Sequence, residues 1–222
     1  MTRQDDRMAH PYWPLFDLEV RTPRLTMRHL DDELETKLIE TASRGIHPPG
    51  YMPFSLPWTE AESPEFERNA LAFYWRNRSV TPESWNILFA VIVDGDVVGS
   101  TNLGAEGFPV KRWFETGSWL GSAYQGTGLG KELRIATLHL GFLGFDALVA
   151  GTAAYTDNAP SLGVTRSLGY VRNGIEHHAR GGELAVIDRY RMSREHFLAD
   201  VQRDDVEISG DGPVRELLGI TR

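Results

Sequence analysis

The sequence predicts an α+β domain built on a mixed, mostly antiparallel sheet of about seven strands flanked by helices. Residues 85–93 form a near-continuous apolar run, and the turn Asp94-Gly95-Asp96 joins it to a second run at 97–103, which predicts a hairpin. The aromatic stretch 114–120 extends this hairpin into an antiparallel meander. A segment of helical spacing separates it from the apolar run 145–153, and the order strand, helix, strand predicts a right-handed parallel crossover.

The other elements follow from local signals. Residues 22–28 alternate as a short strand, and Asp31 or Asp32 can cap a helix that ends near Ser43. Gly169 is a typical residue for the end of a helix. Further helices are expected at 64–78, 129–140, 157–168 and 193–201, and further strands at 170–174 and 185–192.

Length and composition favour one domain. A chain of 222 residues with 41% hydrophobic content can bury a substantial core. We assign that core to residues 18–200, preceded by an extended arm at 1–17 and followed by a C-terminal extension at 201–222. We expect a cytoplasmic protein, because there is no cysteine for disulfides or thiolate chemistry, the N-terminus is too polar for a signal peptide, and no apolar run is long enough for a membrane span.

The net charge of −8 bears on possible partners. An acidic chain of pI near 5.4 is a poor match for a nucleic-acid backbone, so we expect no nucleic-acid partner and no membrane partner. The same charge suits a cationic or amine substrate.

A glycine-rich turn at 125–130 runs directly into a predicted helix. The first N–H groups of a helix have no internal partner, and glycines let the backbone approach an anion, so this arrangement is typical of a phosphate site. A Walker loop does not fit, because Glu132 stands where a hydroxyl residue is needed. A dinucleotide fingerprint does not fit either, because Lys131 stands where its third glycine should be.

The loop Gln125-x-x-Gly128-x-Gly130 resembles the pyrophosphate loop of the acyl-CoA-dependent GNAT N-acetyltransferase superfamily. Three further matches occur in the family's order, namely Thr22-Pro23-Arg24-Leu25, Glu115-x-Gly117-x-Trp119-Leu120, and Asp157-Asn158-x-x-Ser161 leading to Leu168-Gly169-Tyr170. They are similar to the RimJ/RimL-like branch, and the sequence also resembles an actinobacterial subgroup that includes a mycobacterial succinyltransferase.

The resemblance implies a GNAT fold in residues 18–200, splayed between strands 4 and 5 of the sheet, with the pantetheine arm of the cofactor in the gap. The donor would be acetyl-CoA or another acyl-CoA such as succinyl-CoA, with no metal. Asn158 is an ordinary helix cap, a ligand of a pantetheine amide, or both. The implied cofactor-binding residues are Trp119, Leu120, Gly121, Gln125, Gly126, Thr127, Gly128, Leu129, Gly130, Lys131, Asn158 and Ser161.

The chemistry depends on the amine, which must lose a proton before it attacks a thioester. For a lysine-like amine the scarcity of free base costs roughly 4 kcal/mol, and for an α-amine about 1. Glu115 is the candidate general base, directly or through water, or else a carboxylate satisfied by a neighbouring arginine or by the backbone. The backbone N–H of Leu120 is the candidate oxyanion donor. Many GNAT enzymes have a tyrosine as general acid where this chain has Thr165, so Ser161 or solvent would take that role, or none is needed.

A proline-rich and aromatic segment at 47–58 is either a loop pinned to the core or a rigid wall of the substrate pocket. The expected pocket residues are Met52, Phe54, Trp58, Trp85 and Phe89. A succinyl donor would need a cation, for which Arg28, Arg166 and Arg180 are candidates.

The predicted function is transfer of an acyl group from CoA to an amine by direct attack in a ternary complex. The acceptor would be a small molecule, a protein N-terminus or a lysine, and the enzyme a homodimer. The alternative is a non-catalytic acyl-CoA sensor. His177 and His178 lack the further ligand that a metal site needs.

Overall fold

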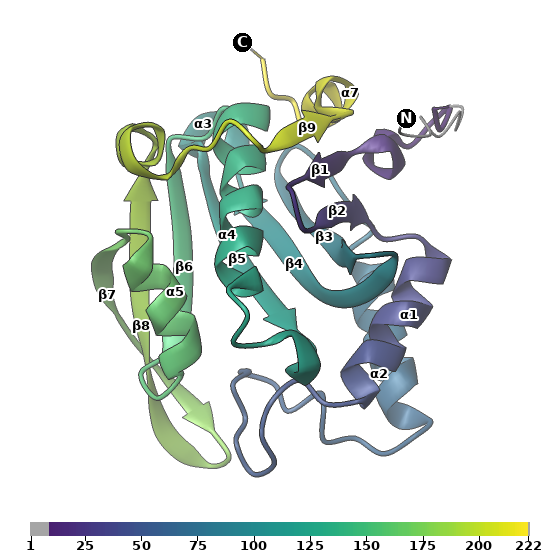
Figure 1. The fold of residues 1–222 in the computed structure, drawn as a ribbon, viewed down its shortest axis with the longest axis vertical. Helices are drawn as coiled ribbons and strands as arrows, with labels where there is room; N and C mark the ends of the chain where they lie inside the picture. Colours follow the sequence, from purple (N-terminus) through teal and green to yellow (C-terminus); the bar gives the residue numbers. More distant parts are fainter. Residues whose placement is uncertain (1–8, 222) are drawn as a thin grey trace.

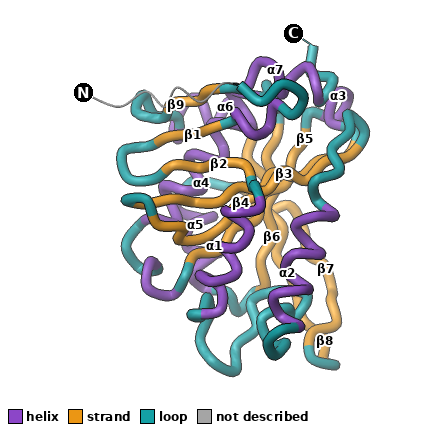
Figure 2. The backbone as a smooth tube through the Cα atoms, turned by 90° about the vertical axis from the view of Figure 1, so that its right-hand side faces the viewer, coloured by secondary structure: helices purple, strands orange, loops and turns teal. Residues whose placement is uncertain are grey.

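A computed structural model describes residues 9–221, so the first eight residues of the predicted N-terminal arm lie outside it. The described residues form one nine-stranded sheet with the order β7-β8-β6-β5-β4-β3-β2-β1-β9 (Figures 1 and 2). Neighbouring strands are antiparallel except for β5 and β6, which are parallel. The strands are β1 (Glu19–Arg21), β2 (Thr26–His29), β3 (Ser84–Val93), β4 (Asp96–Glu106), β5 (Trp113–Leu120), β6 (Val149–Tyr155), β7 (Val171–Arg180), β8 (Glu183–Ser193) and β9 (Glu207–Ser209).

Helices cover both faces of the sheet. Figure 1 shows α4 and α5 in front of the sheet and α1 and α2 at its right-hand end. The α-helices are α1 (Asp32–Ser43), α2 (Glu65–Arg76), α3 (Phe108–Lys111), α4 (Leu129–His139), α5 (Ala159–Ser167), α6 (Arg194–His196) and α7 (Asp211–Leu217). Short 3-10 helices occur at η1 (Pro14–Asp17) and η2 (Ser122–Tyr124), and π-helical turns at η3 (Leu140–Gly144) and η4 (Phe197–Val201).

The alternation of β3 divides the interior into two cores. Phe89 and its neighbours on the same face pack with the buried side of α4 in the larger core. Leu88 and Ala90, on the opposite face, pack with α1 and α2 in a smaller core. Because successive side chains of a strand point to opposite faces, the two cores have separate linings. The site described below involves both faces.

The expectation of about seven strands is corrected to nine in the described residues. The predicted strand 22–28 is a hairpin, in which β1 and β2 are joined by a turn closed by a hydrogen bond from the Thr22 N–H to the Leu25 carbonyl (2.9 Å). The C-terminal residues supply the ninth strand, because β9 pairs with β1 at the sheet edge and Leu218 is fully buried beyond it. The predicted cap of α1 is confirmed, since the Asp31 carboxylate accepts from the Leu34 N–H (2.9 Å).

Candidate active site

The parallel strands β5 and β6 pair over only part of their length. Residues 113–116 pair with residues 149–152, and Thr116–Thr152 is the last pair. Beyond it, residues 117–120 of β5 pair only with β4, and residues 153–155 of β6 pair only with β8. The two strands therefore open into a fork whose apex is the Thr116–Thr152 pair, as predicted (Figure 1).

The glycine-rich loop lies at the open end of the fork, after β5. Gly126 and Gly128 have φ angles of 73° and 80°, a region that other residues rarely adopt, and nothing lies within 4 Å of the position of a Cβ on Gly126. Within the described chain, the N–H groups of residues 126–128 donate to no protein acceptor. With the first N–H groups of α4, they form an open cradle of donors with a clear approach for an anion.

Gln125 has a different role from the one expected. Its side-chain amide donates to the carbonyls of Ile46 and Leu120, both at 2.8 Å. These bonds hold the loop against the end of β5 and the end of the α1 segment. The Gln125 amide is therefore committed to protein carbonyls, and the backbone groups that follow it form the phosphate cradle. Lys131 is also directed away from the cradle, with Nζ 3.4 Å from the Ser167 carbonyl.

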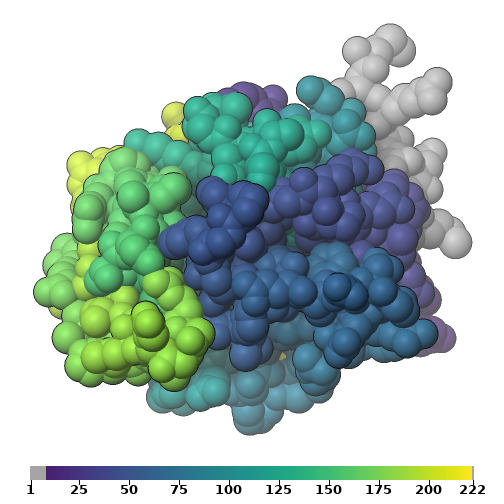
Figure 3. Space-filling model, turned by 90° about the horizontal axis from the view of Figure 1, so that it is seen from below, coloured from purple at the N-terminus to yellow at the C-terminus, as the bar shows by residue number. Residues whose placement is uncertain are grey.

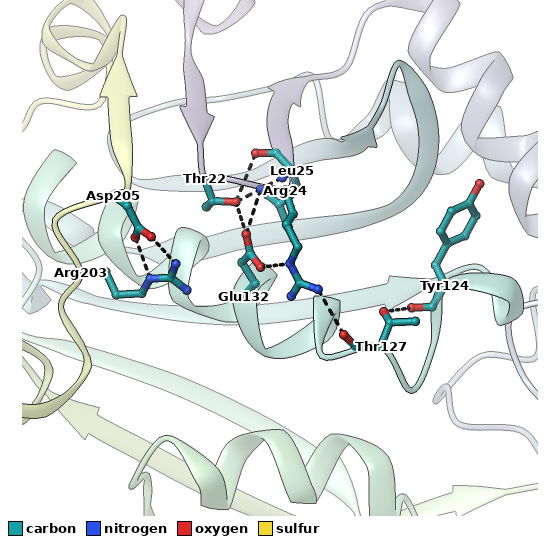
Figure 4. Close-up of polar contacts among 8 residues, drawn as sticks. All are labelled: Thr22, Arg24, Leu25, Tyr124, Thr127, Glu132, Arg203 and Asp205. Carbon is teal, nitrogen blue, oxygen red and sulfur yellow. Dashed lines mark hydrogen bonds and ion pairs between the residues drawn. The ribbon is translucent and has the colours of Figure 1, made fainter.

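A polar cluster joins the loop to the β1–β2 turn (Figure 4). The Glu132 carboxylate in the first turn of α4 accepts from the Thr22 hydroxyl (2.6 Å), the Arg24 N–H (3.2 Å) and Arg24 Nε (2.5 Å). Arg24 Nη1 also donates to the Thr127 carbonyl (3.2 Å). Burial alone would raise the pKa of the Glu132 carboxyl, but the bonds from Thr22 and Arg24 outweigh it and lower the pKa.

Two of the expected site residues begin α5, beside the open end of β6. Asn158 is the N-cap, and its side-chain oxygen accepts from the Ser161 N–H at 3.2 Å. This bond leaves the Asn158 amide nitrogen free for another acceptor, so a capping role is compatible with a ligand-binding one. Thr165 lies one helical turn further on and is only 1% exposed.

Glu115 lies on the paired part of β5, one residue before the apex. Its Oε1 accepts from Arg189 (2.7 Å) and from the Trp113 indole N–H (2.8 Å). Arg189 also binds Glu176 (2.8 Å). The Glu115 carboxylate is therefore paired with an arginine. Its Oε2 has no hydrogen-bond partner among the described residues, so this oxygen can still accept a proton.

The space beside Glu115 is a cavity of about 520 Å³ on the α2 side of the sheet. Its lining combines apolar surface, including Trp85 and Trp113, with polar side chains from Arg76, Asn77, Asn86, Glu106, Lys111 and Glu115. A chain of side-chain amides crosses its floor, in which Asn102 donates to Asn86 (2.6 Å) and Asn86 to Asn77 (2.7 Å). Asparagines within otherwise apolar strands are the sequence signal for this cavity.

The loop 47–58 is neither helix nor strand, as its prolines predicted. The centroid of the Trp58 ring lies 5.5 Å from that of Phe54 and 6.1 Å from that of Trp119, which is on the part of β5 beyond the last β6 pair. The Met52 carbonyl accepts from Arg180 at the end of β7 (3.3 Å). The loop therefore spans from β5 toward the β7–β8 hairpin, and Figure 3 shows it in dark blue between the green hairpin side and the blue surface of α2.

The expectation that Trp85 and Phe89 line the same pocket as this loop is corrected. The Trp85 ring packs against Phe108 and Phe145 in the larger core, with ring centroids 5.3 Å and 5.9 Å apart. Phe89 is fully buried there as well. Both side chains point to the α4 face, whereas Phe54, Trp58 and Trp119 pack on the α1–α2 face. The continuous apolar run of β3 gave no indication of which residues face which side.

No group of three or more potential metal ligands is found within residues 9–221. In the same residues, no helix is long and apolar enough to cross a membrane.

A fork between two parallel strands, with a phosphate cradle at its open end, defines a class of enzyme that transfers acyl groups from CoA. The family comparison agrees with this geometry, because the acetyltransferase (GNAT) domain model matches residues 24–171. The chain belongs to this family and is an N-acyltransferase.

Solved structures share the fold at low sequence identity. Mycobacterium smegmatis RimJ in complex with CoA-disulfide matches with a TM-score of 0.65 and 15% identity, covering 84% of this chain and 95% of that one. A GNAT-family acetyltransferase from Bacillus anthracis matches with a TM-score of 0.61 and 19% identity, over 80% and 99%. The Salmonella typhimurium acetyltransferase that modifies the N-terminal serine of ribosomal protein L7/L12 matches with a TM-score of 0.61 and 15% identity, over 78% and 96%.

Proposed function

We propose that this enzyme is a RimJ/RimL-like N-acetyltransferase that binds acetyl-CoA in the β5–β6 fork and transfers the acetyl group to an amine by direct attack. The observation that carries the proposal is the end of β5–β6 pairing at Thr116–Thr152, which opens a fork toward the donor cradle at residues 126–128. Unpaired backbone groups in a sheet are costly unless a partner satisfies them. A pantetheine arm, with its amides, is a partner of suitable shape for this gap.

The cradle fits a diphosphate for a physical reason. The N–H groups that follow Gln125 are unpaired, and the positive end of the α4 dipole lies behind them. No side chain fills the space in front of Gly126. The Asn158 amide nitrogen and the backbone of Trp119, Leu120 and Gly121 would then contact the pantetheine arm. When bound, the donor supplies an activated thioester, and the residues of the fork and the loop position it.

Acceptor and donor approach from different faces in this proposal. Glu115 and the polar cavity lie on the α1–α2 face, whereas α4 and its loop cover the other face. An amine in the cavity would lose its proton to Glu115, directly or through water. The Leu120 N–H would donate to the oxygen that becomes negative during attack.

The acceptor class is a primary amine, and we favour a protein N-terminus. The net charge of the chain is −8, which favours a cationic acceptor, whereas the charges of the cavity lining are balanced, Glu106 and Glu115 against Arg76 and Lys111. The N-terminal serine that the similar Salmonella enzyme modifies is an acceptor of this kind. A direct assay distinguishes a protein N-terminus from a small-molecule amine or a lysine as the acceptor.

We propose acetyl-CoA as the donor in preference to succinyl-CoA. Of the three arginines considered for a succinyl carboxylate, Arg180 is already paired with Asp157 and stacks on the Tyr155 ring at 4.1 Å. Arg28 is on β2, several strands from the fork, and Arg166 is exposed on α5.

The test is a donor and acceptor screen that follows release of free thiol. We expect turnover with acetyl-CoA and with peptides that carry a free N-terminus, and none with peptides whose N-terminus is blocked. Thermal stabilisation by CoA without turnover on any amine would support the sensor alternative instead. The homodimer remains a prediction from the resemblance and the cytoplasmic location a prediction from composition, and light scattering at working concentration tests the dimer.

A further inference from the structure

A buried arginine lies at the apex of the fork without a carboxylate partner. Arg134, on the sheet-facing side of α4, is only 5% exposed. Its Nη1 donates to the Thr152 hydroxyl (2.8 Å), and its Nε is buried without any hydrogen-bond partner in the described residues. None of the ion pairs formed by residues 9–221 includes Arg134. A permanently charged guanidinium is costly to bury in this state, so the site calls for an anion.

The hydrogen bonds of Arg134 place it at the point where the two strands separate. The Thr152 hydroxyl that accepts from Arg134 donates in turn to the Thr116 carbonyl (3.3 Å), and these two threonines form the last β5–β6 pair. The apex is the deepest point that a chain inserted between the strands can reach. Arg134 is also roughly 9 Å along the helix axis from the phosphate cradle. It therefore lies toward the end of the fork that a reactive thioester would occupy.

The other polar groups at the apex carry no competing negative charge. Tyr170, which follows α5, has a buried hydroxyl close to Arg134 and Thr116, and burial raises the pKa of its phenol, so it stays protonated at neutral pH. Glu115 of β5 is on the opposite face, where Arg189 of β8 offsets its charge.

We propose that Arg134 stabilises the thiolate of CoA as it leaves, and so takes the place of a general acid. This inference rests on the proposed function and adds to it that the donor sulfur lies toward the apex, on the Thr116 side of the Leu120 N–H. The amine nitrogen forms the new C–N bond with its lone pair, the C–S bond breaks, and sulfur keeps the electron pair as a thiolate. The amine proton goes to Glu115 or water. A guanidinium next to the sulfur favours the anion electrostatically, so no proton has to be delivered to it.

Thr165 explains why the leaving thiolate needs stabilisation from another residue. It stands where a tyrosine acid occurs in many related enzymes, and it is buried with no ionisable group to offer. A permanent positive charge from the neighbouring helix α4 solves the same chemical problem by a different means, because it lowers the basicity of the leaving group and does not donate a proton.

The decisive measurement is the pKa of the thiol of bound, free CoA, followed by the ultraviolet absorbance of its thiolate during pH titration. In the wild-type complex we expect this pKa to lie at least about one unit below that of CoA in solution, a tenfold shift in the ionisation constant. Arg134→Gln should remove the shift, Arg134→Lys should keep part of it, and Arg68→Gln, which removes an exposed charge on α2, should leave it unchanged.

Binding of desulfo-CoA, which has no thiol, checks that the cradle is intact, and we expect Arg134→Gln to change its affinity less than threefold. The same variant should lower kcat at least tenfold with a small change in the KM for acetyl-CoA. If Arg134→Gln does not fold, Thr152→Val, which removes the anchor of Nη1 together with the hydrogen bond to the Thr116 carbonyl, should give a partial loss of the shift.

An unshifted thiol pKa in the wild-type complex would overturn the inference, as would an equal shift in Arg134→Gln. A variant that loses only succinyl-CoA turnover, with the thiol pKa unchanged, would assign Arg134 to a donor carboxylate instead. Failure of the wild type to bind CoA at all would contradict the proposed function itself, so the two failures are distinguishable.

Discussion

The guanidinium of Arg24 and the carboxylate of Glu132 form an ion pair, with Arg24 Nε 2.5 Å from Glu132 Oε2. Glu132 is in the first turn of α4, whereas Arg24 belongs to the turn between β1 and β2 (Figure 4). Arg24 also binds the carbonyl of Thr127 inside the phosphate cradle. The Thr-Pro-Arg-Leu opening of the sequence, which we used only as a mark of resemblance, therefore fixes the position of the loop.

Arg24→Gln should loosen the loop. We expect the KM for acetyl-CoA to rise about tenfold with little change in kcat, because the bond to Thr127 orders the cradle and contacts no reacting atom. The free energy of unfolding should fall by about 1–3 kcal/mol, less than for a fully buried pair because Arg24 is half exposed. Lys37→Gln breaks an exposed pair on α1 and should change the free energy of unfolding much less. Equal losses for both variants would contradict the role of Arg24.

The Glu132 ion pair also predicts a pH dependence of stability. The pKa of the Glu132 carboxyl is lower in the folded state than in the unfolded chain, where it is about 4.3. Its contribution is therefore fully present above the unfolded pKa and is lost as pH falls through the folded pKa. The free energies of unfolding of the wild type and Glu132→Gln, measured in urea, should differ most above about pH 5 and converge at lower pH. A stability difference that persists unchanged to pH 3 would rule out this linkage.

Glu115→Gln should slow the reaction according to the basicity of the amine. We expect kcat/KM to fall about 10² to 10⁴-fold for a lysine-like acceptor and less for an α-amine, because a smaller fraction of the first is already deprotonated. Glu106→Gln is the matched control, since it removes a carboxylate from the same cavity. If both variants lose the same activity on both amines, Glu115 acts through cavity charge and not as a base.

The glycines of the cradle should respond differently to alanine. Gly126→Ala and Gly128→Ala force a residue with a Cβ to a positive φ, which costs about 1 kcal/mol of folding stability, and should weaken CoA binding at least fivefold. Gly130→Ala has ordinary φ and only one contact, at 3.8 Å, and should bind CoA nearly as well. Calorimetric titration of the three variants measures this order, and uniform affinity would show that the cradle does not hold the phosphates.

Local signals in the sequence predicted the parts of the fold that local physics controls. Asp31 caps α1 because its side chain reaches an N–H three residues away, whatever the rest of the chain does. The hairpin at 22–28 was missed because its turn depends on Glu132, which is distant in sequence. The alternating pattern of those residues is equally compatible with one continuous strand.

The candidate site was predictable in its backbone and not in its side chains. The glycines after Gln125 indicated the cradle, but the same motif gave no sign that the Gln125 amide binds Ile46 and Leu120. The burial of Arg134 was likewise not predictable. The segment 132–139 of α4 is buried at every position in the structure, although it also contains Glu132, Thr137 and His139. Only the strand pairing shows that Arg134 lies beside the apex.

Amide hydrogen exchange with and without acetyl-CoA tests the central claim most directly, because one edge of β5 beyond Thr116 and the loop after Gln125 carry unpaired N–H groups. We expect the donor to protect amides within residues 117–120 and 126–130, with little change in β1, β2 and β9. Protection confined to other segments, or the absence of any protection at saturating acetyl-CoA, would contradict the claim that the parted strands and the loop after Gln125 hold the donor.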